Sequence, residues 1–344
     1  MRMQKLELPE DSMLCSGHAA CPGCVDALSV RHVLAALGPK TMAIIPPSCM
    51  AIIAGPQPYS SLRIPVYQPS LESSAAAASG LRRALDARGE HDTQVIVLAG
   101  DGGTYDIGFQ CLSSAAERNE NFIYFCLDNE GYMNTGAQKS GATRFGADRS
   151  TSPIGSRYAG KTTLHRRIVA QAMSISHVYA AKLSIDNPQY AIKILKEAIA
   201  YNGPSVVEFF SGCPQGQQAP DWAAPLISRM MVEARKWQIA VRRPFQRLDI
   251  SANPEPEKIY PAEGKSFKKG LKRDPATFYD VVSMLGQYNQ HIKTRNGDFS
   301  PEIIQVNEMV SLFRWLRSQY LAGYRDTMPT EEEVEQIVAE RYRV

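Results

Sequence analysis

Two apolar runs in the sequence end in residues that suit a magnesium ion. Residues 95–99 are followed by Gly100-Asp101-Gly102-Gly103, and residues 122–127 are followed by Asp128-Asn129-Glu130-Gly131. Mg²⁺ prefers hard oxygen ligands and takes only one or two carboxylates when phosphate groups supply the others. Asp101 and Asn129 can provide carboxylate and amide oxygens, and the glycines around Asp101 allow backbone N–H groups to approach a phosphate. These residue types predict a site for a magnesium-bound diphosphate.

Parallel strands must bring the two segments together. Asp101 and Asn129 are 28 residues apart, which is enough for a turn, a helix and the next strand. Residues 107–118 predict that helix, and its N-terminus favours an anion. A crossover of this kind makes the two strands parallel, and ligands of open parallel sheets bind at the carboxyl ends of the strands. We therefore expect both segments at one edge of a sheet.

The cysteines indicate a second chemistry. The chain has 7 of them, and Cys21-Pro22-Gly23-Cys24 is a C-x-x-C pair that can direct two thiolates toward one metal or cluster. A zinc ribbon normally has a second such pair, and a thioredoxin-type pair follows a strand; the sequence predicts neither here. A site completed by distant single cysteines remains. The first ten residues lack an apolar signal segment, so we expect a cytoplasmic protein with reduced thiols.

The diphosphate segments resemble a known cofactor motif. Gly100-Asp101-Gly102, followed at this spacing by Asn129, resembles the thiamine-diphosphate motif, and residues 132–143 are similar to the β subunits of 2-oxoacid:ferredoxin oxidoreductases, of the pyruvate enzyme type. The resemblance implies thiamine diphosphate held through Mg²⁺, with Asp101, Asn129 and the carbonyl of Gly131 as metal ligands. The cofactor-binding residues that it implies are Gly100, Asp101, Gly102, Gly103, Asn129, Gly131 and Cys49.

The same resemblance implies a four-iron four-sulfur (4Fe-4S) cluster. Its four thiolate ligands would be Cys21, Cys24, Cys49 and Cys213. The chain departs from the family at Val25, where glycine is usual, and at Ala137 after the Asn-Thr-Gly stretch, although neither position supplies a ligand atom. The remaining cysteines are Cys15, which receives no role, and Cys111 and Cys126, which we expect to be small buried hydrophobes. His18, just before the C-x-x-C pair, could approach the cofactor or could instead be bonded to nearby backbone.

The function implied by the resemblance is a catalytic subunit of an oxidoreductase of anaerobic metabolism. It would decarboxylate a 2-oxoacid, pyruvate or an aryl or branched analogue, to an acyl group on coenzyme A, with electrons passing through the 4Fe-4S cluster to ferredoxin or another carrier. Asn134 would be catalytic and face the reacting carbon. An α-type subunit would supply the glutamate that contacts the aminopyrimidine ring, and ferredoxin-like and γ-type subunits would complete the complex.

Other functions stay open on the sequence alone. A non-oxidative thiamine-diphosphate decarboxylase or synthase would lack the cluster, and a structural subunit would keep the fold without turnover. Residues 155–162 also match the P-loop pattern G-x-x-x-x-G-K-[ST], so a nucleotide hydrolase using Lys161 is a third alternative. A P-loop follows a buried strand, whereas residues 144–153 have the composition of a loop, which argues against that alternative.

The wider sequence predicts an α/β protein with a parallel sheet flanked by helices. We expect a cofactor- and cluster-binding domain over residues 1–215 and a helical C-terminal arm over residues 216–344 that contacts partner subunits. The net charge of +3 gives no support for nucleic-acid binding, and no apolar run is long enough to span a membrane. The predicted helices are 29–38, 72–88, 163–175, 188–201, one or two within 222–241, 301–320 and 330–343, and the further strands are 42–45, 177–183 and 205–210. The basic run 265–273 predicts a solvated loop or a partner contact.

Overall fold

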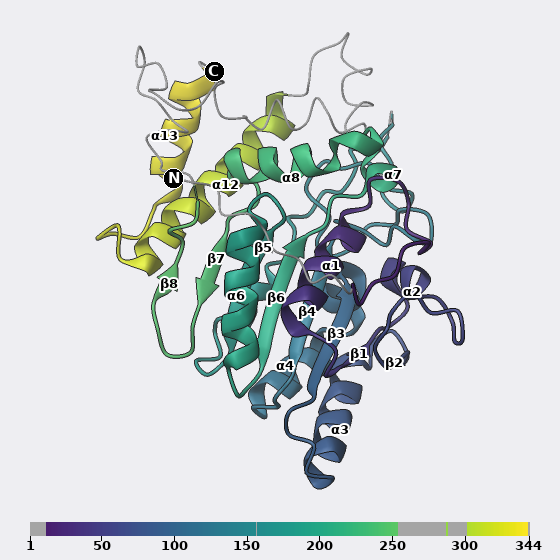
Figure 1. Ribbon diagram of the computed structural model, residues 1–344. Coiled ribbons are helices and arrows are strands. Elements are labelled where there is room, and N and C mark those ends of the chain that lie inside the picture. The colour runs from purple at the N-terminus through teal and green to yellow at the C-terminus, as the bar shows by residue number, and fades with distance from the viewer. Residues whose placement is uncertain (1–11, 156, 254–286, 288–300, 343–344) are drawn as a thin grey trace.

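The computed structural model describes residues 12–155, 157–253, 287 and 301–342. Within this part of the chain, one eight-stranded sheet runs through the molecule in the order β2-β1-β3-β4-β6-β5-β7-β8 (Figure 1). The strands from β1 to β6 are parallel, and β7 and β8 extend the sheet in antiparallel pairs. The strands are β1 (Thr41–Ile44), β2 (Val66–Tyr67), β3 (Gln94–Gly100), β4 (Ile123–Asp128), β5 (Tyr179–Ser184), β6 (Ser205–Phe210), β7 (Ala240–Arg242) and β8 (Leu248–Asp249).

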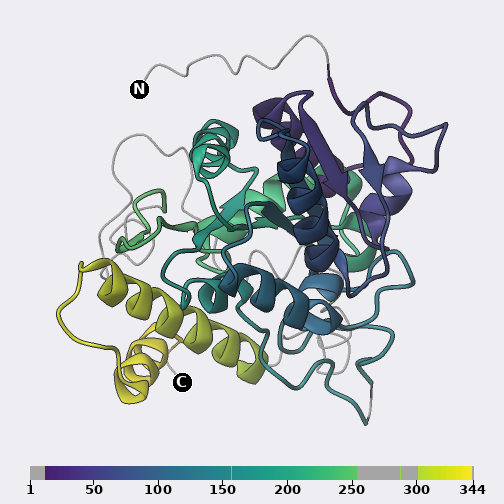
Figure 2. The ribbon, with the colours of Figure 1, turned by 90° about the horizontal axis from the view of Figure 1, so that it is seen from below.

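Helices cover both faces of this sheet. The longer ones are α1 (Val25–Leu37), α3 (Ser74–Ala87), α4 (Phe109–Glu117), α6 (Pro188–Ala200), α8 (Ala224–Glu233), α12 (Pro301–Ala322) and α13 (Glu331–Tyr342). The shorter ones are α2 (Cys49–Ala54), α5 (Ile168–Ala172), α7 (Pro214–Gln217) and the 3₁₀ turn η2 (Asp221–Ala223). Helices α1 and α6 lie on one face, and α3 and α4 lie on the other (Figures 1 and 2). The expected parallel α/β fold flanked by helices is confirmed.

The central strands are apolar on both sides because both faces are covered. Along β3, Ile96 and Leu98 pack into the core beneath α1 and α6, whereas Val95 and Val97 pack into the core beneath α3 and α4. Side chains of a strand alternate between faces, so a continuous apolar run is what a doubly covered parallel strand requires. This pattern made β3 and β4 predictable from the sequence.

The helix after β3 begins differently from the sequence prediction. Residues 102–107 form a π-helix, η1 (Gly102–Ile107), and α4 follows from Phe109. The Thr104 hydroxyl donates to the carbonyl of Gly100 at 2.8 Å, and a Cβ atom at Gly108 would overlap the carbonyl oxygen of Gly103. The wide turn therefore depends on a glycine at position 108. It opens the backbone directly beside the predicted diphosphate site, and π-turns are common at such positions.

The helical prediction for residues 222–241 is wrong at its C-terminal end. Helix α8 ends at Glu233, and residues 240–242 form β7 beside β5. The Trp237 indole donates to the carbonyl of Leu183 at 2.8 Å, and its side chain is buried. This contact turns the chain back to the sheet edge. Part of the predicted C-terminal arm is therefore continuous with the sheet. The helix predicted for 163–175 is likewise shorter, since only α5 is helical there.

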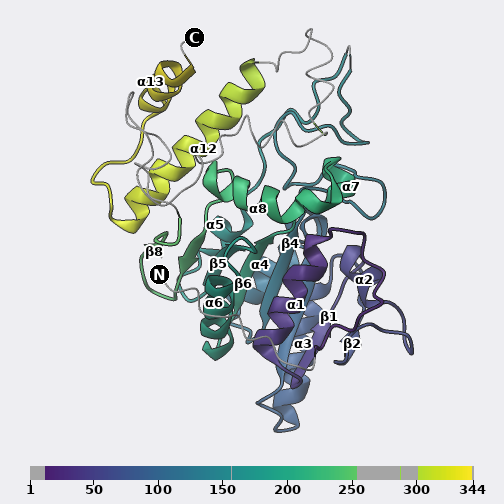
Figure 3. The same cartoon turned by 45° about the horizontal axis from the view of Figure 1, so that its top comes forward.

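The C-terminal helices pack against the same chain. Trp315 of α12 shares a buried cluster with Ala240 and Ile250 at the β7–β8 edge, and Leu312 packs against Val334 of α13. Figures 2 and 3 show α12 lying along this edge with α13 beside it. Contact with a partner subunit stays a prediction, and the basic run 265–273 lies outside the described residues. None of the described helices combines the length and hydrophobicity needed to cross a bilayer.

Candidate active site

A pocket of about 150 Å³ lies where β3 and β4 end. The segments after both strands line it, as the crossover argument predicts for a parallel sheet. Of the residues named from the sequence, it contains Cys49, Gly100, Asp101, Gly102, Gly103, Asn129, Gly131 and Asn134. The remaining lining residues come from α1, the start of α2, the end of β4 and the loops beside the two strands: Asp26, Pro47, Ser48, Met50, Leu71, Leu127, Tyr132, Met133 and Thr135.

The three expected magnesium ligands meet at one point. In one orientation of the Asn129 amide, its oxygen faces Asp101 Oδ1 and the carbonyl oxygen of Gly131, and its nitrogen donates to Asp26 Oδ2 at 3.4 Å. In the other orientation, its nitrogen donates to Asp101 Oδ1 at 3.0 Å and to the Gly131 carbonyl at 2.8 Å. The first orientation gathers the three oxygens that a cation needs. Asp101 is buried and also accepts a hydrogen bond from the hydroxyl of Ser140. A carboxylate, an amide and a backbone carbonyl therefore converge, which is a donor set of the kind that Mg²⁺ takes when phosphate completes its coordination.

A second carboxylate stands beside them. Asp26 is buried in α1, and its Oδ1 atom has no hydrogen-bond partner among the described residues. Burial raises the pKa of Asp26 to about 7, although Ser211 and Asn129 lower it in part. Burial also raises the pKa of Asp101 to about 8, and the Ser140 hydroxyl counteracts part of this rise. Two buried carboxyl groups without a nearby cation fit a site that receives a divalent cation.

Among the described residues, no group of three or more His, Cys, Asp or Glu side chains is close enough to hold a single metal ion. This agrees with a magnesium site that uses one carboxylate, because the amide and carbonyl oxygens are not of those residue types.

The four predicted cluster cysteines lie around the N-termini of three helices. Cys24 precedes α1, Cys49 begins α2, and Cys213 caps α7, where its sulfur accepts from the N–H of Gly216 at 3.3 Å. Cys21 is exposed in the turn before α1. The backbone N–H of Cys24 donates to the carbonyl of Cys21 at 3.1 Å, which closes the C-x-x-C turn.

Their thiols influence one another electrostatically. Burial and the nearby Asp26 carboxylate raise the pKa of Cys24 to about 12, with a further contribution from Cys213. Burial is the largest cause of the strongly raised pKa of Cys49. The nearby Asp26, Cys213 and Cys24 groups raise that pKa further. Burial likewise raises the pKa of Cys213, to which Cys21 contributes. Such thiols stay protonated unless a positively charged metal displaces the protons, so they fit iron ligation better than free nucleophilic chemistry.

The two predicted centres share walls. Cys49 lines the diphosphate pocket, whereas Cys21 and Cys24 line a neighbouring cavity with His18. Asp26, two residues after Cys24 on α1, reaches back into the diphosphate pocket. The thiol region and the carboxylate region are therefore separated by little more than the first turns of α1 and α2.

Loop residues 140–143 hold Asp101 in place. The ammonium group of Lys161 donates to the carbonyls of Ser140 (2.9 Å), Gly141 (3.3 Å) and Thr143 (2.6 Å), and its side chain is buried. In the described residues around Lys161, no strand precedes the P-loop pattern and no helix follows it directly. The nucleotide-hydrolase alternative is therefore not supported, because Lys161 is occupied as a support for the loop that carries Ser140.

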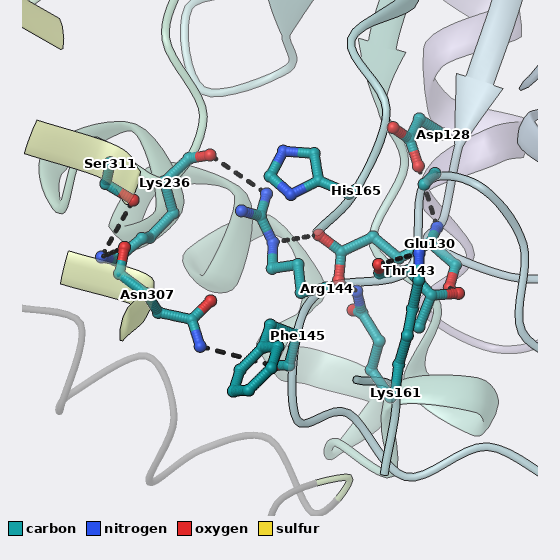
Figure 4. A network of polar contacts seen from close by, with 12 residues as sticks. Asp128, Glu130, Thr143, Arg144, Phe145, Lys161, His165, Lys236, Asn307 and Ser311 are labelled. Atoms are coloured by element: carbon teal, nitrogen blue, oxygen red, sulfur yellow. Dashed lines mark hydrogen bonds and ion pairs between the residues drawn. The ribbon is translucent and has the colours of Figure 1, made fainter. Parts of the chain in front are cut away.

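A buried ion pair fixes the chain just after Asn129. Arg144 donates to the carboxylate of Glu130, and the Thr143 hydroxyl donates to the Glu130 carbonyl at 2.6 Å. Figure 4 shows this pair between the end of β4 and the loop that contains Lys161. Arg144 also donates to the carbonyl of Lys236 at 3.0 Å, and Lys236 in turn reaches α12 through Ser311 (3.1 Å). The site loop is thereby connected to the C-terminal helix.

Sequence reasoning missed Asp26, Ser140 and Lys161 as parts of this site. A helical Asp, a loop Ser and a Lys inside a false P-loop match have no distinctive spacing relative to Asp101. Asp26 had one indication in the sequence, since it lies two residues after a predicted cluster ligand. The other two became visible only when the loop after β4 was placed over the end of β3.

Comparison with known proteins agrees with this geometry. Residues 52–209 match the C-terminal thiamine pyrophosphate-binding domain of thiamine pyrophosphate enzymes. The chain is 38% identical over 235 residues to ketoisovalerate oxidoreductase subunit VorB of Pyrococcus abyssi, covering 67% of this chain and 76% of that protein. It is 37% identical over 232 residues to pyruvate synthase subunit PorB of Methanothermobacter thermautotrophicus, covering 67% of this chain and 81% of that protein.

A third relative extends the match along the chain. Pyruvate synthase subunit PorB of Thermotoga maritima is 33% identical over 287 residues, which cover 79% of this chain and 87% of that protein. The chain belongs to the family of 2-oxoacid:ferredoxin oxidoreductase β subunits. This β subunit is part of a multi-subunit 2-oxoacid oxidoreductase, and the resemblance stated from its motifs is confirmed.

The fold of the β subunit is also found in a solved enzyme. The 2-oxoglutarate:ferredoxin oxidoreductase from Magnetococcus marinus, with 2-oxoglutarate, coenzyme A and succinyl-CoA bound, aligns with a TM-score of 0.50 at 24% identity. The alignment covers 62% of this chain and 70% of that chain. It supports the α/β fold of the β subunit.

Proposed function

We propose that this β subunit binds thiamine diphosphate through Mg²⁺ at the β3–β4 pocket and carries a 4Fe-4S cluster beside it. The enzyme would convert a 2-oxoacid and coenzyme A to an acyl-CoA and carbon dioxide, and would pass the electrons to ferredoxin or another carrier. The observation that supports this most is the meeting of Asp101, Asn129 and the Gly131 carbonyl in a pocket that Cys49 also lines.

The chain's own residues divide the work of holding the cofactor. Asp101, Asn129 and the Gly131 carbonyl would bind Mg²⁺, and the backbone at Gly102 and Gly103, where η1 begins, would face the diphosphate oxygens. When bound, thiamine diphosphate supplies an electron sink for loss of carbon dioxide. The protein residues position the metal and exclude water from the buried side of the pocket.

We propose that Asn134 contacts the substrate. It lines the pocket and is exposed, so its amide lies at the pocket mouth rather than in the core. An amide there can donate to a developing negative charge on a substrate oxygen, and it carries no charge that would need burial. We therefore assign Asn134 as the catalytic residue of this chain.

Cys21, Cys24, Cys49 and Cys213 would bind the irons of the cluster, which supplies a one-electron acceptor. Each thiolate of such a cluster binds a different iron, so the four sulfur atoms stand further apart than the ligands of a single metal ion. Cys213 raises the pKa of Cys24 in part, and both raise that of Cys49. The Cys21–Cys24 turn brings Cys21 to the same region, which supports one shared centre.

The active site needs a partner. The carboxylates among the described lining residues are Asp26 and Asp101, and no glutamate is among them. We propose that an α-type subunit supplies the glutamate for the aminopyrimidine ring, that γ-type and ferredoxin-like subunits complete a cytoplasmic complex, and that residues 216–344 take part in those contacts. Pyruvate and branched 2-oxoacids are the leading substrates because relatives are named for pyruvate and ketoisovalerate, with aryl 2-oxoacids as further candidates.

The decisive experiment isolates the native complex without oxygen. We expect bound thiamine diphosphate, an absorption that dithionite bleaches, and 2-oxoacid- and coenzyme A-dependent reduction of a viologen dye with at least one of pyruvate, ketoisovalerate and phenylglyoxylate. Cys49→Ser should remove cluster iron, and Cys111→Ser serves as the control because Cys111 lies on α4, away from both centres. A complex that contains no iron and releases an aldehyde would instead establish the non-oxidative alternative.

A further inference from the structure

A second, larger cavity lies at the opposite side of the sheet from β2. Its volume is about 450 Å³, and its walls come from the segment before α5, from β5 to β8 and from α12. It shares no lining residue with the diphosphate pocket, so it is not an extension of that site. Figure 3 shows the edge formed by β7, β8 and α12.

The lining of this cavity is strongly cationic. Among its described lining residues, nine are arginine or lysine and one, Glu208, is a carboxylate. We call this cavity the arginine pocket. Its cationic residues are Arg166, Arg167, Lys182, Arg235, Lys236, Arg242, Arg247, Arg314 and Arg317.

The single carboxylate is already engaged. Glu208 is buried, pairs with Lys182 at 2.5 Å and accepts from the Tyr105 hydroxyl at 2.7 Å. Within the described structure, the side chains of Arg167, Arg247 and Arg317 form no hydrogen bond or ion pair. The cavity therefore gathers an excess of positive charge that the described residues do not neutralise.

The cations also repel one another. Burial lowers the pKa of Arg314 to about 9, and the neighbouring Arg167 and Arg144 guanidinium groups add to the effect. Burial lowers the pKa of Arg167, with a further contribution from Arg317. Of the three unpaired side chains, that of Arg167 is half-buried, and its charge is therefore partly withheld from water; an anion in the cavity would offset this cost.

The many arginines of the pocket favour a phosphate-containing anion. The guanidinium group is planar and presents several N–H donors in a fork that matches phosphate oxygens, and seven of the nine cationic residues are arginines. The cavity volume falls within the range of small-molecule sites, of about 300–1,000 Å³, so it can hold a ligand of nucleotide size. Arg235 stacks on the ring of Trp315, with 3.5 Å between the guanidinium carbon and the ring centroid, which holds its fork rigid in the wall.

We propose that the arginine pocket binds an organic polyphosphate, a ligand with two or more phosphate groups attached to a nucleoside. A free nucleoside polyphosphate and the phosphorylated nucleotide end of coenzyme A share this chemistry. The inference depends only on the charge and shape of the cavity. It does not depend on the function proposed for the diphosphate pocket.

Calorimetric titration of the native complex at low ionic strength tests the inference, with inorganic tripolyphosphate, ATP and coenzyme A as probes. The test variant is Arg167→Gln/Arg317→Gln. The matched control is Arg88→Gln/Arg118→Gln, which removes two exposed arginines that pair with Glu90 and Glu120 elsewhere on the surface. We expect the test variant to bind about tenfold more weakly or worse, the control to bind as the unaltered complex does, and added salt to weaken binding.

Each outcome has a defined meaning. Binding of tripolyphosphate and ATP that the test variant weakens supports a general polyphosphate site. Binding of coenzyme A alone supports a site for that nucleotide only where the test variant weakens it and the control does not, since coenzyme A is also the proposed co-substrate. No binding by any probe, or equal affinity of the test and control variants, overturns the inference. If the double variant fails to fold, Arg317→Gln and Arg317→Lys replace it. Arg317 is exposed on α12, and the lysine variant should keep part of the affinity that glutamine loses.

Discussion

At the scale of single residues, the site combines two carboxyl groups that are unfavourable without a cation. Asp26 and Asp101 are both buried, and the charge of Asp26 adds to the raised pKa of Asp101. The folded chain therefore resists ionisation of these groups, and the Mg²⁺ that we propose for this site would favour it. Metal binding and stability should be linked through them.

The metal-free protein should lose stability as the pH rises from about 4 to about 8. In the folded chain the pKa values of Asp26 and Asp101 are raised to about 7 and about 8, so the unfolded chain binds fewer protons across this interval. The free energy of unfolding must then fall with rising pH. Melting temperatures in EDTA between pH 5 and 8 measure this, and Asp26→Asn should flatten the dependence. Stability that rises over the interval in EDTA, unchanged by Asp26→Asn, would refute the assignment.

Asn134→Ala should lower kcat on the order of a hundredfold if its amide stabilises a developing oxyanion. The side chain is exposed, so the melting temperature should stay the same. Viologen-coupled assays of the complex give kcat and KM separately. Asn121→Ala, which removes a surface hydrogen bond to Asn202 (2.8 Å), is the control and should leave kcat unchanged. Unaltered turnover of the Asn134 variant would remove it from the mechanism.

At the scale of elements, the turn from β3 into η1 is built for close approach. A Cβ atom at Gly102 would overlap the ring of Tyr132, whose hydroxyl donates to the Gly102 carbonyl at 3.1 Å and to Asp106 at 3.0 Å. The ring thus closes one side of the diphosphate pocket. The backbone of Gly102 is not in the left-handed region, so its φ angle does not require glycine. The close contact with the Tyr132 ring does.

Gly102→Ala should therefore destabilise the protein and weaken thiamine diphosphate binding, since the Tyr132 ring must move. Gly80 on α3 provides a matched comparison, because a Cβ atom there meets nothing within 4 Å. Gly80→Ala should raise the free energy of unfolding by about 0.5–1 kcal/mol, as expected for alanine in a helix interior. Chemical denaturation and cofactor titration measure both effects. Equal responses of the two variants would contradict the packing described for Gly102.

Arg144→Met should lower the free energy of unfolding by about 3–5 kcal/mol, because it leaves the Glu130 carboxylate buried without its cation. Adding Glu130→Gln should recover much of this loss. Arg229→Met serves as the control: its pair with Glu233 is half exposed on α8, and its removal should cost about 1 kcal/mol or less. Urea denaturation of the unaltered protein, the two single variants and the double variant measures these free energies of unfolding. A cost for Arg144→Met no larger than that of the control would show that the pair in Figure 4 is not structural.

At the scale of the whole molecule, we propose that the diphosphate pocket is an incomplete active site. The purified β subunit should bind thiamine diphosphate and Mg²⁺ but should not decarboxylate a 2-oxoacid until an α-type subunit is added. The physical reason is that no glutamate lines the described pocket. Single-turnover release of carbon dioxide, with and without the partner, measures this. Decarboxylation by the isolated chain would place the missing acid within the chain itself.

The C-terminal region packs against the sheet of the same chain. It was expected to be an arm beyond residue 215, yet β7 and β8 widen the sheet, and α12 forms a wall of the arginine pocket. Long-range contacts, such as that of Trp237 with Leu183, hold this region against the sheet. The spacing of apolar residues within 222–241 gives no information about such contacts.

The sequence by itself determined the features that arise from neighbouring units of the chain. Apolar runs ending in Gly-Asp-Gly and Asp-Asn predicted parallel strands and the meeting of Asp101 with Asn129, because one crossover connects them and its geometry allows few alternatives. The family followed from the same short segments. In these segments the residues that would bind the cofactor directly follow the strands that position them, so a pattern along the sequence was sufficient to predict both.

Only the tertiary structure decided which distant residues share a cavity. Asp26 and Ser140 reach Asp101 from a helix and a loop far away in sequence, and the cations of the arginine pocket are spread from residue 166 to residue 317. Each of them alone has the sequence character of an ordinary surface or helical residue. Their proximity results from packing of the whole sheet and its covering helices, for which no local spacing rule exists.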